Sequence, residues 1–286
     1  MITLLSDFGL RDAYVATMKG TIAQIAPRIP MCDITHLIPP QDILAARFNL
    51  RTACSHFPSG SVHLAVVDPG VGSSRRAIAF QTPQAFFVGP DNGIFDGILE
   101  SDDILCAVTL TNSKYWRTAH PSNTFHGRDI FAPVSAHLAN GVPIRELGDR
   151  IQPSTLTRLD LPPCIPNAHR PTSNSSTNSQ LLCTGSLQYI DGFGNLISNI
   201  PQSWVPMSPP PSPWEIQIDT ANGPQRFPGV STYSDVPVGT LAALVGSHGW
   251  VEVACNSGSA QNALRSSDQT PAVMVGTTVS LRTASP

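Results

Sequence analysis

The spacing of apolar residues changes partway along the chain, and this change constrains the fold more than any other feature. In the first half, short apolar runs such as Ile2 to Leu5 and Val62 to Val67 alternate with segments in which apolar residues recur at helical spacing. From residue 181 onward, only short β-like runs follow one another. The first pattern favours a mixed sheet flanked by helices, and the second favours an all-β barrel or sandwich.

Three regions are expected from this pattern. We predict an N-terminal α/β domain over residues 1–162 and a C-terminal β-barrel domain over residues 181–286. Residues 163–180 between them are rich in Pro, Ser, Asn and Thr, which bury little apolar surface, so this stretch is expected to be a linker. The Pro-rich stretch 201–214 is expected to be a surface loop. A chain of 286 residues is long enough for two domains.

Individual elements can be placed from periodicity and breakers. Asp12 is expected to cap a helix that Pro27 stops, and further helices are expected from Ile43 to Phe57 and from about Arg128 to Asn140. An Asn222-Gly223 pair predicts a hairpin. The remaining expected strands are 77–80, 86–88, 104–110, 181–190, 196–200, 215–219, 241–245, 250–255 and 272–283.

Composition argues against several classes of protein. The 17 basic and 20 acidic side chains give a net charge of −3, which disfavours a nucleic-acid binder. The six cysteines form no Cys-x-x-Cys pair and the histidines no His-x-x-x-His pair, so neither a metal site nor a disulfide framework is indicated. The first residues lack a basic region and a long apolar stretch, so we expect no signal peptide and no membrane span. A cytoplasmic protein with reduced cysteines is predicted.

Two carboxylates follow predicted strands of the first region. Asp7 follows the first strand and Asp68 follows the strand that ends near Val67. Each can be a plain turn former. Ligands in open α/β sheets, however, bind beyond the carboxyl ends of the strands. The glycines of Pro69–Gly72 would let the backbone approach a ligand, and Arg75 is close enough in sequence to pair with Asp68.

Further candidates lie elsewhere. His126 precedes a predicted helix, where it can take part in acid–base chemistry or simply cap and pack. Asp191 and Asn195 lie in a turn that is slightly better explained as a glycine-rich hairpin, yet they suit an ammonium group and an amide-like aromatic edge. A glutamate at position 252 is not explained by strand formation, so Glu252 is a further candidate. No Gly-x-Ser-x-Gly elbow is present. The residues alone therefore favour a hydrolase that acts through paired carboxylates.

Six short motifs are spread over nearly the whole chain. They are Leu5–Gly9, Val66–Gly72, Gly89–Gly93, Thr124–Asp129, Ile190–Asn195 and Asn256–Gly258. Together and in this order they resemble the SAM hydroxide adenosyltransferases, the hydrolytic relatives of the SAM-dependent fluorinase and chlorinase. The resemblance implies that water displaces methionine from C5′ of S-adenosyl-L-methionine (SAM), giving adenosine and L-methionine, without a metal or cofactor. It also implies a homotrimer with active sites between the first domain of one subunit and the second domain of its neighbour.

The resemblance also assigns roles to residues. The family's Asp-Arg-His triad falls on Asp68, Arg75 and His126. The implied substrate contacts are Asp7 at the ribose hydroxyls, Asn195 and the backbone near Cys255 at the adenine, Asp191 and Ser247 at the methionine end, Tyr233 as a ring wall, and Glu252 as a further contact.

Two alternatives remain open. A halogenase would share the ribose and adenine motifs, but the fluorinase has an aromatic hydroxyl where Asp68 stands and Tyr-Ser where His126 and Gly127 stand. A carboxylate at that point repels halide and suits water. A non-catalytic adenosine or SAM sensor would have no use for the triad. The sequence leaves open which sulfonium nucleoside is the substrate.

Overall fold

The chain divides into two units, Met1–Leu159, which contains both strands and helices, and Asp160–Pro286. The computed structural model describes residues 1–167, 180–206, 213–265 and 272–284. The fold class predicted from the sequence, an α/β domain followed by an all-β barrel, is confirmed. None of the helices in the described part of the chain is long and apolar enough to cross a lipid bilayer.

The first unit is built on a six-stranded mixed sheet. Every residue of the neighbouring strands β1 (Ile2–Ser6) and β3 (Ser61–Val66) is buried, as expected for parallel strands covered on both faces. The strand β4 is antiparallel to both of its neighbours, and the other pairs are parallel. The strand order is β2 (Met31–Thr35), β1 (Ile2–Ser6), β3 (Ser61–Val66), β5 (Ala85–Pro90), β4 (Ala77–Gln81) and β6 (Cys106–Thr109).

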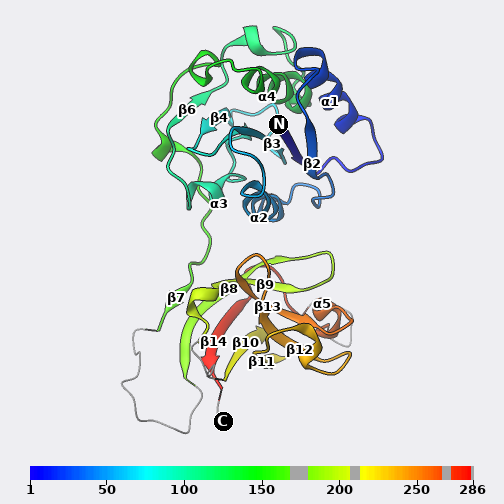
Figure 1. Ribbon diagram of the computed structural model, residues 1–286, viewed down its shortest axis with the longest axis vertical. Coiled ribbons are helices and arrows are strands. Elements are labelled where there is room, and N and C mark those ends of the chain that lie inside the picture. The colour runs from blue at the N-terminus through cyan, green and yellow to red at the C-terminus, as the bar shows by residue number, and fades with distance from the viewer. Residues whose placement is uncertain (168–179, 207–212, 266–271, 285–286) are drawn as a thin grey trace. The chain divides into compact units, whose positions relative to one another are not determined.

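Helices cover both faces of this sheet. Figure 1 shows α1 (Tyr14–Ile25) and α4 (Ala132–Ala139) on one face, and α2 (Ile43–Cys54) and α3 (Asp96–Leu99) on the other. The face under α1 and α4 holds an apolar core in which Met18 and Ile22 are fully buried.

The helix ends differ from the sequence-based expectation in three places. Asp12 does not cap α1, because Ala13 occupies the cap position and no side chain bonds there. Asp42 caps α2 by accepting a hydrogen bond from the Ala45 amide, and α2 ends at Cys54, before Phe57. The helix expected from Arg128 begins instead as a wider π-turn over Gly127–Phe131, a feature that is frequent at functional sites.

The second unit is a barrel in which all named strand pairs are antiparallel. The edge strands meet through a bridge between Gly229 and Ala243, which brings the sheet close to closure. The strand order is β11 (Gly223–Pro228), β10 (Trp214–Thr220), β14 (Thr278–Thr283), β8 (Leu181–Ile190), β9 (Leu196–Pro201), β13 (Trp250–Cys255) and β12 (Leu241–Val245), and β7 (Ile165–Pro166) pairs with β8. A short helix, α5 (Ala260–Ala263), follows β13.

Two details of this unit depart from the expected elements. The hairpin turn consists of Ala221 and Asn222, because Gly223 already pairs with Thr220. The strand expected over residues 272–283 is shorter and starts at Thr278. The predicted linker, 163–180, lies mostly outside the described residues, as does much of the 201–214 loop.

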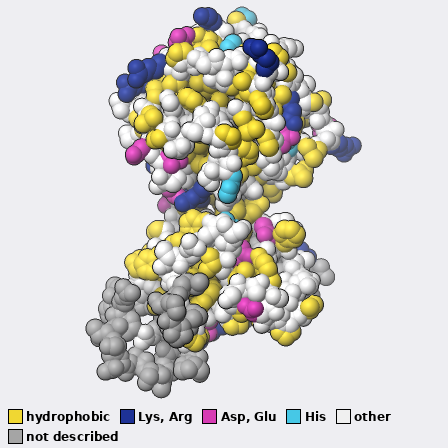
Figure 2. Space-filling view, in the orientation of Figure 1, with side chains coloured by type: hydrophobic (Ala, Val, Ile, Leu, Met, Phe, Trp, Pro, Cys, Tyr) yellow, Lys and Arg dark blue, Asp and Glu magenta, His cyan; other side chains and the backbone are white. Residues whose placement is uncertain are grey.

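Charged side chains are sparse on the surface. On the face that Figure 2 shows, the Lys and Arg side chains of the first unit stand apart from one another around its rim. The described residues therefore present no continuous basic patch on that face.

Candidate functional site

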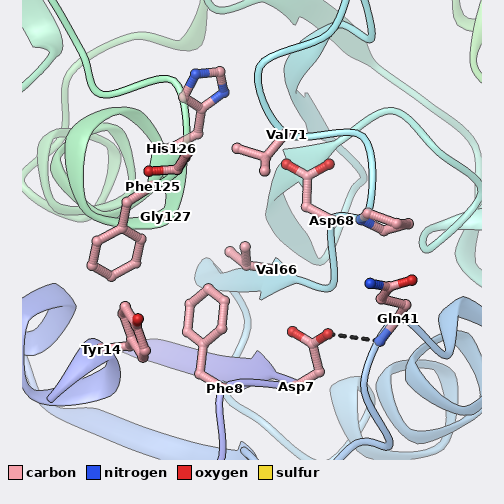
Figure 3. Close-up of a pocket in the computed structure, with 12 residues that line it drawn as sticks. Asp7, Phe8, Tyr14, Gln41, Val66, Asp68, Val71, Phe125, His126 and Gly127 are labelled. Atoms are coloured by element: carbon pink, nitrogen blue, oxygen red, sulfur yellow. Dashed lines mark hydrogen bonds between the residues drawn. The ribbon is translucent and has the colours of Figure 1, made fainter. Parts of the chain in front are cut away.

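A cavity of about 370 Å³ opens in the first unit, beyond the carboxyl ends of β1 and β3. This is the position at which open α/β sheets bind ligands. Figure 3 shows the carboxylates of Asp7 and Asp68 on one side and the rings of Phe8, Tyr14 and Phe125 on the other. The remaining lining residues are Gln41, Val66, Pro69, Val71, Thr124, His126 and Gly127.

Asp68 forms a bidentate ion pair with Arg75. The Nε atom of Arg75 donates to both carboxylate oxygens, at 2.9 and 3.0 Å, and Nη2 donates to Oδ2. The side chains are only 6% and 10% exposed, so the pair is shielded from water and holds a defined geometry. The turn between them depends on Gly72, which has a φ of +78° and lies against the Asn123 carbonyl, where a Cβ atom would clash.

His126 extends this pair. Its Nδ1 atom lies 2.8 Å from Nη2 of Arg75. Because a guanidinium can only donate, Nδ1 accepts the hydrogen bond, and the hydrogen of the neutral imidazole is on Nε2. Burial, and then the charge of Arg75, lower the pKa of His126 below its usual range, although Asp68 and Asp129 act in the opposite direction. The sequence-predicted residues Asp68, Arg75 and His126 therefore lie together, with His126 neutral at pH 7.

Asp7 is held at the end of β1 by the loop before α2. Its Oδ2 atom accepts a hydrogen bond of 2.8 Å from the backbone amide of Gln41. His36, at the start of the same loop, makes two further contacts with this region. Its backbone carbonyl accepts a hydrogen bond from the Gly9 amide, and its Nδ1 atom lies 2.7 Å from the Ser6 hydroxyl. Gln41 has a φ of +67°, a conformation that non-glycine residues rarely adopt. Hydrogen bonds from Gln41 to the Asp7 side chain, and between His36 and both Ser6 and Gly9, thus hold the end of β1 in place.

The aromatic wall of the cavity consists of three rings in mutual contact. The ring centroids of Phe8, Tyr14 and Phe125 lie 5.2–5.7 Å apart. Phe8 and Phe125 belong to the sequence motifs, but sequence reasoning gave them no role, and it missed Tyr14 and Gln41. Proximity to Asp7 in the sequence was a usable signal for Tyr14. No sequence signal pointed to Gln41, because only the tertiary fold brings its loop close to the end of β1.

The other predicted substrate contacts lie in the second unit. Oδ1 of Asp191 accepts from the amides of Phe193 and Asn195, and Oδ2 accepts from the Asn195 side chain, each at 2.9 Å. Ser247 is exposed and Cys255 is half-buried. The three hydrogen bonds to Asp191 hold the Asp191–Asn195 turn in one conformation.

Glu252 is buried in the same unit and already has partners on both oxygens. The Tyr233 hydroxyl donates to Oε1 at 2.8 Å, and His248 Nε2 lies 2.9 Å from Oε2. Burial and the hydrogen bond to Glu252 raise the pKa of Tyr233 to about 12. Sequence reasoning had selected Tyr233 and Glu252, but it predicted no contact between these two side chains. Over the described ranges, no three His, Cys, Asp or Glu side chains are grouped so as to hold a metal ion.

Comparison with known proteins gives consistent matches over most of the chain. Residues 2–148 match the family described as the SAM hydroxide adenosyltransferase N-terminal domain, and residues 185–272 match the corresponding C-terminal domain. The chain is 39% identical to an (R)-S-adenosyl-L-methionine hydrolase of Salinispora tropica over 264 residues, which cover 92% of this chain and 93% of that protein. It is 38% identical to the protein of the same name from Thermus thermophilus, with 92% and 94% covered.

A solved structure agrees with these sequence matches. The crystal structure of an uncharacterized conserved protein from Thermotoga maritima superposes with a TM-score of 0.85 at 31% identity, covering 98% of this chain and all of that chain.

Proposed function

Since the chain belongs to the SAM hydroxide adenosyltransferase family, we propose that it hydrolyses SAM to adenosine and L-methionine. The observation that carries this proposal is the grouping of Asp68, Arg75 and His126 at the edge of a cavity that also contains Asp7. An ion-paired carboxylate and a neutral imidazole offer one acceptor and one donor to a water molecule.

The reaction places modest demands on the protein. A sulfonium is already a good leaving group, so the enzyme has to hold water in line with C5′ and exclude other geometries. The oxygen–C5′ bond forms as the C5′–sulfur bond breaks, and the electron pair of that bond stays on the sulfur of methionine. The attacking water loses one proton in the process.

We assign the handling of this water to the triad. The Asp68 carboxylate accepts a hydrogen bond from the water, and then its proton, while Arg75 keeps the carboxylate in one orientation. The Nε2–H group of His126 donates to the water oxygen and stabilises its developing hydroxide character. A carboxylate beside the reacting centre would repel a halide, which favours water over chloride or fluoride as the nucleophile.

The remaining residues are proposed to bind the substrate. Asp7 has carboxylate oxygens suited to the two ribose hydroxyls, and the Gln41 amide keeps it in place. We propose that the second unit supplies Asn195 and the backbone near Cys255 to the adenine, Asp191 and Ser247 to the methionine end, and Tyr233 as a ring wall. No cofactor is required by this scheme.

A homotrimer is the proposed assembly, with each active site completed by a neighbouring subunit. Light scattering coupled to gel filtration should then give about three times the mass of one chain. A monomer that hydrolyses SAM at full rate would contradict this part of the proposal.

Isotope labelling tests the reaction itself. Purified protein is incubated with SAM in oxygen-18 water, with and without excess chloride, and the nucleosides are identified by mass spectrometry. Adenosine that carries the label at the 5′ oxygen, together with methionine, is the expected result. A 5′-chloro nucleoside would show a halogenase, and bound but unchanged SAM would show a sensor.

A further inference from the structure

Glu252 lies at the centre of a hydrogen-bonded group in the second unit. It belongs to β13, and its side chain is only 4% exposed. Tyr233, from a short turn before β12, donates to one carboxylate oxygen. His248, from the turn between β12 and β13, contacts the other oxygen. A buried carboxylate with donors on both oxygens is satisfied within the chain and does not depend on a ligand.

The direction of each hydrogen bond in this group is determined. The backbone amide of Trp250 lies 3.1 Å from Nδ1 of His248 and can only donate, so Nδ1 is an acceptor. The hydrogen of the neutral imidazole is therefore on Nε2, and it points to Glu252. The raised pKa of Tyr233 keeps its phenol protonated, so the hydroxyl is also a donor. Both partners thus donate to the same carboxylate.

The surrounding backbone leaves space for this arrangement. A Cβ atom at Gly246 would collide with Oε2 of Glu252 and with the His248 ring. Glycine at this position therefore permits the close approach of the two side chains. Tyr233, by contrast, is 44% exposed, and its ring is the part of the group that can touch a ligand.

We propose that Glu252 and His248 are positioning residues that hold the ring of Tyr233 ready for the nucleoside substrate, and that Glu252 does not contact the substrate itself. This inference rests on the proposed function, in which Tyr233 forms a wall of the substrate site. Fixing an exposed aromatic side chain before binding removes part of the ordering cost that binding would otherwise carry. Loss of the group should therefore weaken binding and leave the chemical step largely intact.

Kinetics of three variants test the proposal. Tyr233→Phe keeps the ring and removes the hydroxyl, Glu252→Gln leaves one oxygen for the two donors Tyr233 and His248, and the third variant combines both changes. We expect each single variant to raise KM for SAM roughly three- to tenfold, with a much smaller change in kcat. The combined variant should raise KM no further than the more affected single variant, because both changes break the same connection.

A tyrosine in the other unit supplies a matched control. Tyr115 donates to Oε2 of Glu146 at 2.5 Å, and neither residue lines the cavity beside Asp68. Tyr115→Phe therefore removes the same kind of hydrogen bond and should leave KM unchanged. Additive KM effects of Tyr233→Phe and Glu252→Gln would show that Glu252 contacts the substrate directly, and would overturn the proposal. A lower melting temperature with unchanged KM in both single variants would also overturn it, because it would show a purely structural role.

Binding of adenosine separates this inference from the proposed reaction. Titration calorimetry with adenosine measures the nucleoside site even in a protein that does not turn over SAM. If wild-type protein binds adenosine but forms no product, the proposed hydrolysis fails, and the same variants still test the positioning role through their adenosine Kd. A several-fold weaker Kd in Tyr233→Phe and Glu252→Gln supports the inference, and an unchanged Kd contradicts it.

Discussion

Arg75 and His126 are in direct contact, with Nη2 of the guanidinium 2.8 Å from Nδ1 of the imidazole. The contact sets the tautomer of His126, because Nδ1 must accept the hydrogen bond. It also connects His126 to Asp68, since the same guanidinium holds that carboxylate. The three side chains therefore form one unit in which Arg75 is central, and a change in one of them alters the environment of the other two.

Removal of the carboxylate tests the role given to Asp68. Asp68→Ala should lower kcat by roughly 10²- to 10⁴-fold, because the water loses its proton acceptor. Adenosine binding should change little, since Asp68 is assigned to the water and Asp7 to the ribose. Asp7→Ala is the matched control and should weaken adenosine binding. Near wild-type turnover in Asp68→Ala would refute the triad, provided that circular dichroism shows an intact fold.

The dependence of rate on pH reports the state of His126. Burial and Arg75 disfavour the charged imidazole, so its pKa lies below the usual value of about 6.5. As the pH falls through this lowered pKa, Nδ1 gains a proton that faces Arg75, and the triad contact is lost. We therefore expect the acidic limb of kcat/KM to have its midpoint below pH 6.5. An acidic limb centred above pH 6.5 that disappears in His126→Asn would contradict this assignment.

Much of the first unit could be predicted from the sequence because local pattern determines it. The apolar runs of β1 and β3 are long enough to identify buried parallel strands, and the residues that follow such strands meet at one edge of the sheet. This reasoning places Asp7 and Asp68 at one cavity, as observed. The cap assigned to Asp12 was wrong because the helix begins at Tyr14, so that Ala13, whose side chain cannot accept a hydrogen bond, occupies the cap position.

The remaining contacts depend on tertiary structure. The Gln41 amide reaches Asp7 because β2 pairs in parallel with β1, which places the loop after β2 beside the end of β1. No local pattern around Gln41 indicates that approach. The contact between Tyr233 and Glu252 joins positions 19 residues apart and depends on how the turn before β12 lies against β13. The wider turn at Gly127–Phe131 likewise has no sequence pattern of its own, because its residues are compatible with an ordinary helix.

A buried histidine in the core should make stability depend on pH. His63 on β3 is 1% exposed, and burial lowers its pKa to about 4. The unfolded chain takes up a proton near pH 6.5 while the folded chain does not, so stability is present above pH 6.5 and is lost as the pH falls toward 4. The expected loss is about 2 kcal/mol between pH 7 and 5.

Urea unfolding at both pH values measures this loss. Other ionisable groups also change the stability between these pH values, so His63→Gln serves as the reference. Its free energy of unfolding should fall by about 2 kcal/mol less than that of the wild type between pH 7 and 5. Equal pH dependence in the two proteins would show that His63 is not the group responsible. The variant should be less stable than wild type at pH 7, because His63 contacts Thr3 and Phe87 in a close-packed region.

The backbone of Gln41 provides a prediction in which stability and binding can be separated. A left-handed conformation costs a non-glycine residue about 1–2 kcal/mol, and glycine is free of this cost but loses more entropy on folding. Gln41→Gly should therefore raise the free energy of unfolding by roughly 0.5–1 kcal/mol. The amide that donates to Asp7 is kept in this variant.

Gln41→Ala is the control, because it removes the same side chain from the cavity and keeps the unfavourable φ. Any change in KM that both variants share reports the side chain, and a difference between them reports the backbone that supports Asp7. We expect Gln41→Gly to melt at a higher temperature than Gln41→Ala, with similar KM values for the two. If the alanine variant were the more stable of the two, the strain assigned to Gln41 would be absent, and the loop would hold Asp7 in a relaxed conformation instead.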